Sequence, residues 1–127
     1  MVILAIATVF ISCVDRITPV ELTDTSIMET FVRMDIYAKT NRAIPLSLNI
    51  LPQREGYDDY TTDGWGRPLI YSLTKEGLLT LTSMGKDGKP GGAGEDADIS
   101  VSFHARKPDG SIWVGSDENW IVDAEVR

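Results

Sequence analysis

The hydrophobic residues of this 127-residue chain change their spacing once, and that change limits the possible folds. Near the start they recur every three or four residues, which places them on one face of a helix. From Leu69 onward, apolar and polar residues alternate, which is typical of half-buried strands. We therefore expect an α+β fold, in which one N-terminal helix packs on a small antiparallel sheet.

The expected helix runs from Ser26 to Thr40. Its buried face carries Ile27, Phe31, Met34 and Ala38, and its polar face carries Glu29, Arg33 and Lys39. Ser26 and Glu29 have the spacing of a capping box, in which each side chain binds a free backbone N–H group. Pro45 cannot continue a helix, so the helix should end before it. Residues 15–25 are interpreted as a connector.

The expected strands form two hairpins and one edge strand. The first hairpin joins Leu69–Leu73 to Leu78–Ser83 through a turn at Glu76-Gly77. An extra C-terminal hairpin joins residues 99–105 to Ile112–Val114 through Asp109-Gly110, which readily takes the positive φ angles of tight turns. Residues Trp120–Val126 are expected to add the edge strand.

Composition excludes several functions. The net charge of −7 and the pI near 4.6 argue against nucleic acid as a partner, because phosphate binding needs a basic surface. One Cys and one His cannot supply an ordinary four-ligand zinc site or a disulfide within the chain. His104 is expected on the polar face of a strand, where a lone histidine is usually solvated, so we expect no enzyme.

Residues 1–14 read MVILAIATVFISCV and carry no charged side chain. This run is shorter than the roughly 20 residues that a membrane-spanning helix needs, but it fits the apolar part of a secretory signal or anchor. The segment Val-Phe-Ile-Ser before Cys13 fits a bacterial lipoprotein signal, in which Cys13 is lipidated. The chain is therefore expected to be exported and membrane-anchored, facing the periplasm or the cell exterior.

The segment Gly85–Asp98 reads GKDGKPGGAGEDAD, which fits neither a helix nor a strand. Its glycines allow tight folding that aims carbonyl oxygens inward, and its carboxylates repel each other unless a cation lies among them. Oxygen ligands without His or Cys suit calcium. The alternative is a solvated acidic turn.

The segment Asp63–Tyr71 reads DGWGRPLIY. It is interpreted as a glycine turn that leads into a strand, with Trp65 packed in the core.

In this order, the motifs resemble the C-terminal domain of the type II secretion system protein G family, the major pseudopilins. The matching segments are Asn41–Pro45, Asp63–Pro68 with Tyr71, and Ser83–Ile99, and the resemblance covers about residues 26–100. It implies a calcium loop whose side-chain ligands are Asp87, Asp96 and Asp98, helped by main-chain oxygens near Met84 and Ala93. Glu95 could replace one of these carboxylates.

We therefore divide the chain into residues 1–14 as signal or anchor, residues 15–25 as connector, and residues 26–127 as a pseudopilin-like domain with an extension from about residue 100. The resemblance implies a calcium-stabilised structural protein that works with envelope secretion components or other pseudopilins. The apolar N-terminal run is expected to contact the membrane. The alternative is a membrane-anchored extracytoplasmic lipoprotein, a binding module that uses the extension between Phe103 and Trp120 to hold a ligand.

Overall fold

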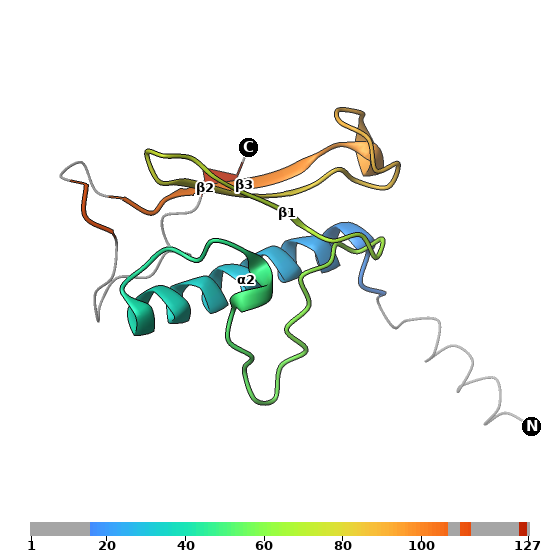
Figure 1. Cartoon of the computed structure of the whole chain (residues 1–127). Coiled ribbons are helices and arrows are strands. Elements are labelled where there is room, and N and C mark those ends of the chain that lie inside the picture. The colour runs from blue at the N-terminus through green and yellow to red at the C-terminus, as the bar shows by residue number, and fades with distance from the viewer. Residues whose placement is uncertain (1–15, 107–109, 113–124, 127) are drawn as a thin grey trace, which may run out of the picture.

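The computed structural model describes residues 16–106, 110–112, 125 and 126 of the 127-residue chain. In this part, helix α2 (Pro19–Asn41) lies along one face of an antiparallel sheet (Figure 1). The strands follow the order of the chain, with β1 (Ile70–Leu73), β2 (Leu78–Ser83), β3 (Ile99–His104) and the short β4 (Glu125–Val126) as neighbours. The expected α+β class, with one helix on a small antiparallel sheet, is confirmed.

Helix α2 begins seven residues before the position expected from the sequence. Its capping box is formed by Thr18 and Glu21, and Pro19 occupies the first turn. Glu21 N–H donates to the Thr18 hydroxyl (3.2 Å), and Thr18 N–H donates to the Glu21 carboxylate (2.8 Å). Proline suits this position because the first helical N–H groups have no partner within the helix. The expected start at Ser26 is therefore wrong, and residues 19–25 are helix rather than connector.

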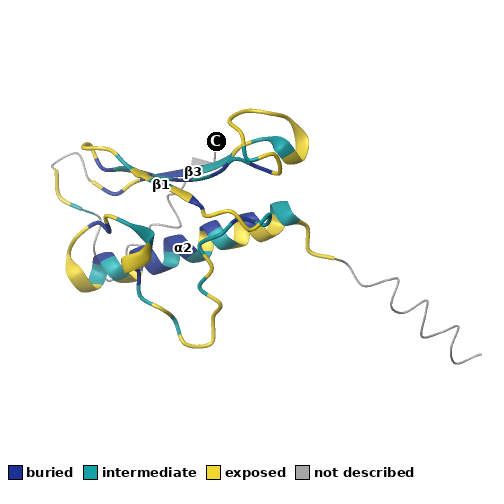
Figure 2. Ribbon diagram, turned by 45° about the vertical axis from the view of Figure 1, so that its right-hand side comes forward, coloured by how far each residue is buried: buried dark blue, intermediate teal, exposed yellow. Residues whose placement is uncertain are grey.

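The core lies between α2 and the sheet, and the buried residues of the two layers face each other (Figure 2). Ile27, Phe31, Met34 and Ala38 are all at most 1% exposed, as their spacing predicts. Burying one large apolar side chain is worth about 1.5 to 3 kcal/mol. Packing against the sheet therefore stabilises α2 more than helix propensity does.

The register of the sheet separates an apolar face from a polar face. Leu79 pairs with Phe103 and Leu81 pairs with Val101, and these four side chains are buried toward α2. On the other face, the hydroxyl groups of Thr80 and Ser102 lie 2.9 Å apart, and those of Thr82 and Ser100 lie 3.0 Å apart. The turn between β1 and β2 is at the expected place, and Gly77 in it has a φ of +86°.

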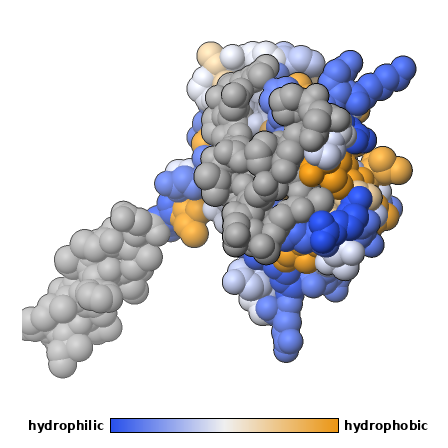
Figure 3. Space-filling model, turned by 90° about the vertical axis from the view of Figure 1, so that its left-hand side faces the viewer, coloured by the Kyte–Doolittle hydropathy of each residue, from blue (hydrophilic) through white to orange (hydrophobic). Residues whose placement is uncertain are grey.

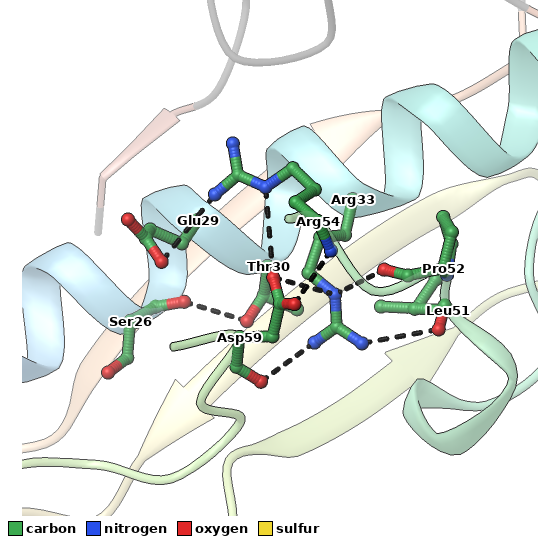
Figure 4. A network of polar contacts seen from close by, with 8 residues as sticks. All are labelled: Ser26, Glu29, Thr30, Arg33, Leu51, Pro52, Arg54 and Asp59. Carbon is green, nitrogen blue, oxygen red and sulfur yellow. Dashed lines mark hydrogen bonds and ion pairs between the residues drawn. The ribbon is translucent and has the colours of Figure 1, made fainter. Parts of the chain in front are cut away.

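The segment between α2 and β1 covers one side of the helix and contains a short 3-10 helix at Leu48–Ile50. Arg33 of α2 points into this segment and is 5% exposed (Figure 4). Its guanidinium donates hydrogen bonds to the main-chain oxygens of Leu51, Pro52 and Asp59. Arg33 was expected on the polar face of the helix, but it is buried, because a distant segment of the chain covers that part of the helix.

Trp65 also differs from its expected position. Its exposure is intermediate, and it does not belong to the buried apolar cluster. Its backbone N–H donates to the Asp63 carboxylate (3.0 Å), so the residue lies in a hydrogen-bonded turn outside the buried cluster. The expectation of a fully buried core residue is wrong.

After β3, the described residues form one isolated bridge and the short strand β4. Arg106 and Ile112 form an antiparallel bridge, but Asp109, Trp113 and Val114 lie outside the described residues, so the extra hairpin stays a prediction. Within the expected edge strand 120–126, the structure describes β4, which pairs with Val101 and Ser102 of β3. The N-terminal segment with Cys13 also lies outside the described residues, and lipidation stays a prediction.

Candidate functional site

The loop at residues 84–98 joins β2 to β3 and is the strongest candidate site. Its ends are held by the sheet, because Ser83 and Ile99 are paired residues of the two strands. Figures 1 and 2 both place this loop at the end of the molecule where α2 begins. The site therefore has a fixed base on the sheet and a position near the N-terminal end of the helix.

Glycine is required at two places where the loop folds back on itself. Gly85 and Gly92 have φ angles of +74° and +96°, which L side chains rarely adopt. A Cβ atom at either position would also lie within 2.9 Å of main-chain atoms of Asp96. The two turns therefore pack directly on the Asp96 backbone.

Two of the expected calcium ligands, Asp87 and Asp98, accept hydrogen bonds inside the loop. The Asp87 carboxylate accepts from Lys89 N–H (3.0 Å), and the Asp98 carboxylate accepts from Gly91 N–H (3.1 Å). The Glu95 carboxylate lies 3.5 Å from the Lys86 ammonium, with both side chains about 60% exposed. An ion pair this exposed contributes little to stability.

The predicted calcium ligands share one loop but are not gathered into a tight cluster. Asp87, Asp98 and Ala93 are exposed, whereas Met84 and Asp96 are half-buried. Within the described ranges, no group of three or more His, Cys, Asp or Glu side chains is close enough to hold a metal ion. The donor chemistry of carboxylate and main-chain oxygens fits calcium. The ligand set itself stays a prediction.

The structure adds a buried carboxylate that the sequence analysis did not select. Asp63 is 6% exposed, and one of its oxygens accepts from Trp65 N–H and Arg67 N–H. Its other oxygen accepts from the Ser83 hydroxyl (2.7 Å), which in turn accepts from Gly85 N–H (3.2 Å). An Asp ahead of a glycine turn often binds backbone N–H groups two or more residues on, and this was the available signal.

Arg67 connects the same turn to the candidate loop. Its guanidinium donates to the main-chain oxygens of Gly85 (2.8 Å) and Lys86 (3.1 Å). A Cβ atom at Gly88 would lie 2.7 Å from the Arg67 guanidinium carbon, so Gly88 leaves room for this side chain. The base of the loop therefore rests on both Asp63 and Arg67.

A separate groove lies where α2 ends, at the face seen in Figure 3, which carries a group of apolar atoms. The groove has a volume of about 520 Å³, and its apolar lining includes Ile44, Leu46, Leu73 and Ile112. Leu46 is 81% exposed.

His104 is exposed at the end of β3, as expected for a residue on the polar face.

No helix in the described ranges combines the length and the apolar character that crossing a membrane requires.

Comparison with known families gives one match. The model of the family described as type II secretion system protein G matches residues 23–102, which is more than half of the chain. Curated proteins and solved structures give no match. The matched region runs from α2 into β3 and includes the Asp63 turn and the 84–98 loop. The chain belongs to the type II secretion system protein G family, a structural component of the secretion machinery and not an enzyme family.

Proposed function

We propose that this protein G family chain is a non-enzymatic structural subunit of a type II secretion system and acts in protein secretion through the cell envelope. The observation that supports this function is the family match, which includes most of α2, strands β1 and β2, the candidate loop and the first part of β3. In this role the protein is exported and contacts the membrane through its N-terminal segment. Its partners are other pseudopilins or other components of the secretion system.

Loss of secretion tests this role. In the organism that encodes the chain, deletion of its gene should stop the release of proteins that depend on the type II system. A plasmid copy of the wild type should restore release, and so should Asp24→Asn, which changes an exposed acid of α2 outside the candidate loop. Undiminished release from the deletion strain would contradict the proposed function.

The 84–98 loop is proposed to bind calcium as part of this function. Asp87 and Asp98 each have one carboxylate oxygen bound to a backbone N–H group of the loop, and each has a second oxygen to offer a cation. Asp96 adds a third carboxylate, and Met84 and Ala93 offer main-chain oxygens. Because the three carboxylates are not gathered among the described residues, calcium binding has to draw them together. The positive-φ glycines between them make the backbone able to adjust.

The calcium dependence of unfolding tests this site. A ligand present at about a hundred times its dissociation constant stabilises the native state by about 2.7 kcal/mol, which raises the melting temperature by several degrees. Calcium should give this rise at constant ionic strength, relative to a chelator. Magnesium should give much less, because it demands a tighter octahedral shell.

Conservative variants separate ligation from general charge effects. Asp87→Asn and Asp98→Asn keep an oxygen that can accept the backbone N–H group, but they lose the negative charge. Each should abolish the calcium-dependent shift, whereas Asp24→Asn should keep it. Superimposable melting curves of the wild type in calcium and in chelator would show that the loop is only an acidic turn.

A further inference from the structure

The start of α2 contacts the turn before β1 directly. Gly64 N–H donates to the Thr23 hydroxyl (2.8 Å), and this hydroxyl donates to the main-chain oxygen of Pro19 (2.7 Å). A Cβ atom at Gly64 would overlap the carbonyl of Pro19. Thr23 is fully buried, so its hydroxyl has no water to replace a lost partner.

Asp63, the residue before Gly64, extends this contact to the candidate loop. Asp63 accepts from the Ser83 hydroxyl, and Ser83 accepts from Gly85 N–H at the first position of the loop where the chain turns. Asp63 and Ser83 are 6% and 1% exposed. A buried polar group that loses its hydrogen-bond partner costs free energy. A displacement of Asp63 therefore has to be accommodated by Ser83, and a displacement of Ser83 by Gly85.

Arg67 provides a second connection in parallel. Its backbone N–H donates to the Asp63 carboxylate (2.9 Å), and its guanidinium donates to the main-chain oxygens of Gly85 and Lys86. One residue thus binds the centre of the turn with its backbone and the base of the loop with its side chain. Two parallel donors on a planar guanidinium fix direction as well as distance, which a lysine ammonium does not do.

We propose that Arg67 is a positioning residue for the 84–98 loop, and that the Asp63 turn couples the conformation of this loop to that of the first turns of α2. The coupling passes through the hydrogen bonds that join Thr23 to Gly64, Asp63 to Ser83, and Ser83 to Gly85, and it does not require calcium. Its biological meaning rests on the proposed calcium site. A cation that orders the loop would also order the start of α2, which is where the chain preceding Pro19 joins the folded body.

Amide hydrogen exchange in chelator tests the coupling in both directions. Lys86 N–H and Gly88 N–H report on the loop, because they donate to Glu95 and Gly85 main-chain oxygens. Gly64 N–H and Leu22 N–H report on the other end, where Leu22 donates to the main-chain oxygen of Thr18. Arg67→Met perturbs the loop side, and Thr23→Val perturbs the helix side.

Each variant has a matched control. Lys89→Met removes a positive charge from the loop, and Lys89 is exposed. Thr25→Val removes a hydroxyl that donates to the helix carbonyl four residues earlier, as Thr23 does, but Thr25 is exposed and does not accept from Gly64. Arg67→Lys keeps the charge and serves as the milder variant if Arg67→Met fails to fold.

Arg67→Met should speed exchange at the loop amides about tenfold, the change expected for losing hydrogen bonds from a charged donor. It should also speed exchange at Gly64 by a few fold, and Thr23→Val should speed exchange at Lys86 and Gly88. Arg67→Lys should give smaller changes at the same amides. Exchange at Gly64 and Leu22 should be unchanged in Lys89→Met, and exchange at Lys86 and Gly88 should be unchanged in Thr25→Val. Effects confined to the mutated side would overturn the coupling, and unchanged loop amides in Arg67→Met would overturn the positioning role.

Calcium titration separates this inference from the proposed site. If the site exists, Lys89→Met should leave calcium affinity unchanged or raise it, because a positive charge is lost. Arg67→Met should lower the affinity, because the main-chain oxygens at the base of the loop are no longer positioned. Higher calcium affinity in both Lys89→Met and Arg67→Met would contradict the positioning role of Arg67. A wild type that binds no calcium would overturn the proposed site, while the exchange results would still decide the coupling.

Discussion

At the scale of single residues, Tyr71 shows how one side chain joins distant parts of the chain. Its hydroxyl donates to the main-chain oxygen of Pro45 (2.6 Å), which ties the start of β1 to the segment that follows α2. Burial raises the pKa of Tyr71 to about 12 from an ordinary value of 10.0, because the anion would lose its hydration. The folded state therefore favours the neutral phenol.

This pKa difference makes stability depend on pH at the alkaline end. Below pH 10 both states hold the Tyr71 proton, whereas between pH 10 and about 12 the unfolded state loses it first, so the free energy of unfolding falls. Tyr71→Phe should be less stable than the wild type by about 1 kcal/mol at neutral pH, because it loses the hydrogen bond. Urea unfolding at a series of pH values should show this gap closing above pH 10. A constant gap would contradict the assignment.

Hydrophobic periodicity could not identify the buried charged residues of this molecule. The spacing along α2 correctly predicted its apolar face, but Arg33 was placed on the polar face and is 5% exposed. Asp63 was interpreted only as part of a glycine turn, although its carboxylate receives hydrogen bonds from three groups. In both cases the partners come from elsewhere in the fold or from backbone N–H groups, which periodicity does not describe.

At the scale of elements, the segment at residues 51–59 is held to α2 by charged side chains (Figure 4). Besides the hydrogen bonds of Arg33, the Asp59 carboxylate lies 3.7 Å from Arg33 Nε and 3.7 Å from Arg54 Nε. Arg54 also lies 3.5 Å from the Glu29 carboxylate, and its guanidinium is 3.8 Å from the centre of the Tyr57 ring. The segment is therefore attached through a network, with Arg33 at its buried end.

Arg33→Met should destabilise the protein by about 3 to 5 kcal/mol, the range for removing one partner of a buried ion pair. The change leaves Asp59 without that partner and removes the donors to three main-chain oxygens. Lys86→Met is the control, because its ion pair with Glu95 is about 60% exposed and should be worth less than about 1 kcal/mol. Urea unfolding of the two variants measures the difference. Similar losses in both would contradict a buried role for Arg33.

The element boundaries show where local signals compete. Two capping boxes are present in the sequence near the start of α2, and the structure uses the one at Thr18 and Glu21. Residues 15–25 were interpreted as a connector, although Pro19 among them is favourable in a first helical turn. Where only one local signal was present, as at the β1–β2 turn with Gly77, the expected boundary was confirmed.

At the scale of the whole molecule, the α+β class was predictable because one helical pattern followed by alternating strands leaves few topologies. The short turn at Gly77 made β1 and β2 predictable as antiparallel neighbours, whereas β2 and β3 pair across the longer 84–98 loop. The fourth strand is different, because β4 comes from the end of the chain and lies outside the matched region 23–102. Its pairing with β3 depends on a long connection, for which the alternating pattern gives no register.

The position of β4 predicts a role for the C-terminal extension in protecting the sheet. In the described structure, Val101 and Ser102 of β3 have β2 on one side and β4 on the other. Deleting residues 113–127 removes β4 and leaves this edge of β3 without its backbone partner. The free energy of unfolding should fall by about 1 to 3 kcal/mol, because the backbone hydrogen bonds of two residue pairs are lost and each hydrogen bond is worth about 0.5 to 1.5 kcal/mol. An unpaired edge strand is also a template for another chain, so the shortened protein should self-associate as its concentration rises.

Urea unfolding and light scattering after size-exclusion chromatography measure the two effects on the same samples. Deletion of Arg127 alone is the control, because it leaves both pairs of β4 with β3 intact and should change neither quantity. The shortened chain should lose stability even at concentrations where it stays monomeric, since the lost pairing is within one molecule. A shortened chain that unfolds at the wild-type urea concentration and stays monomeric at high concentration would show that β4 does not protect this edge. The extension would then have to be explained by contacts outside the sheet.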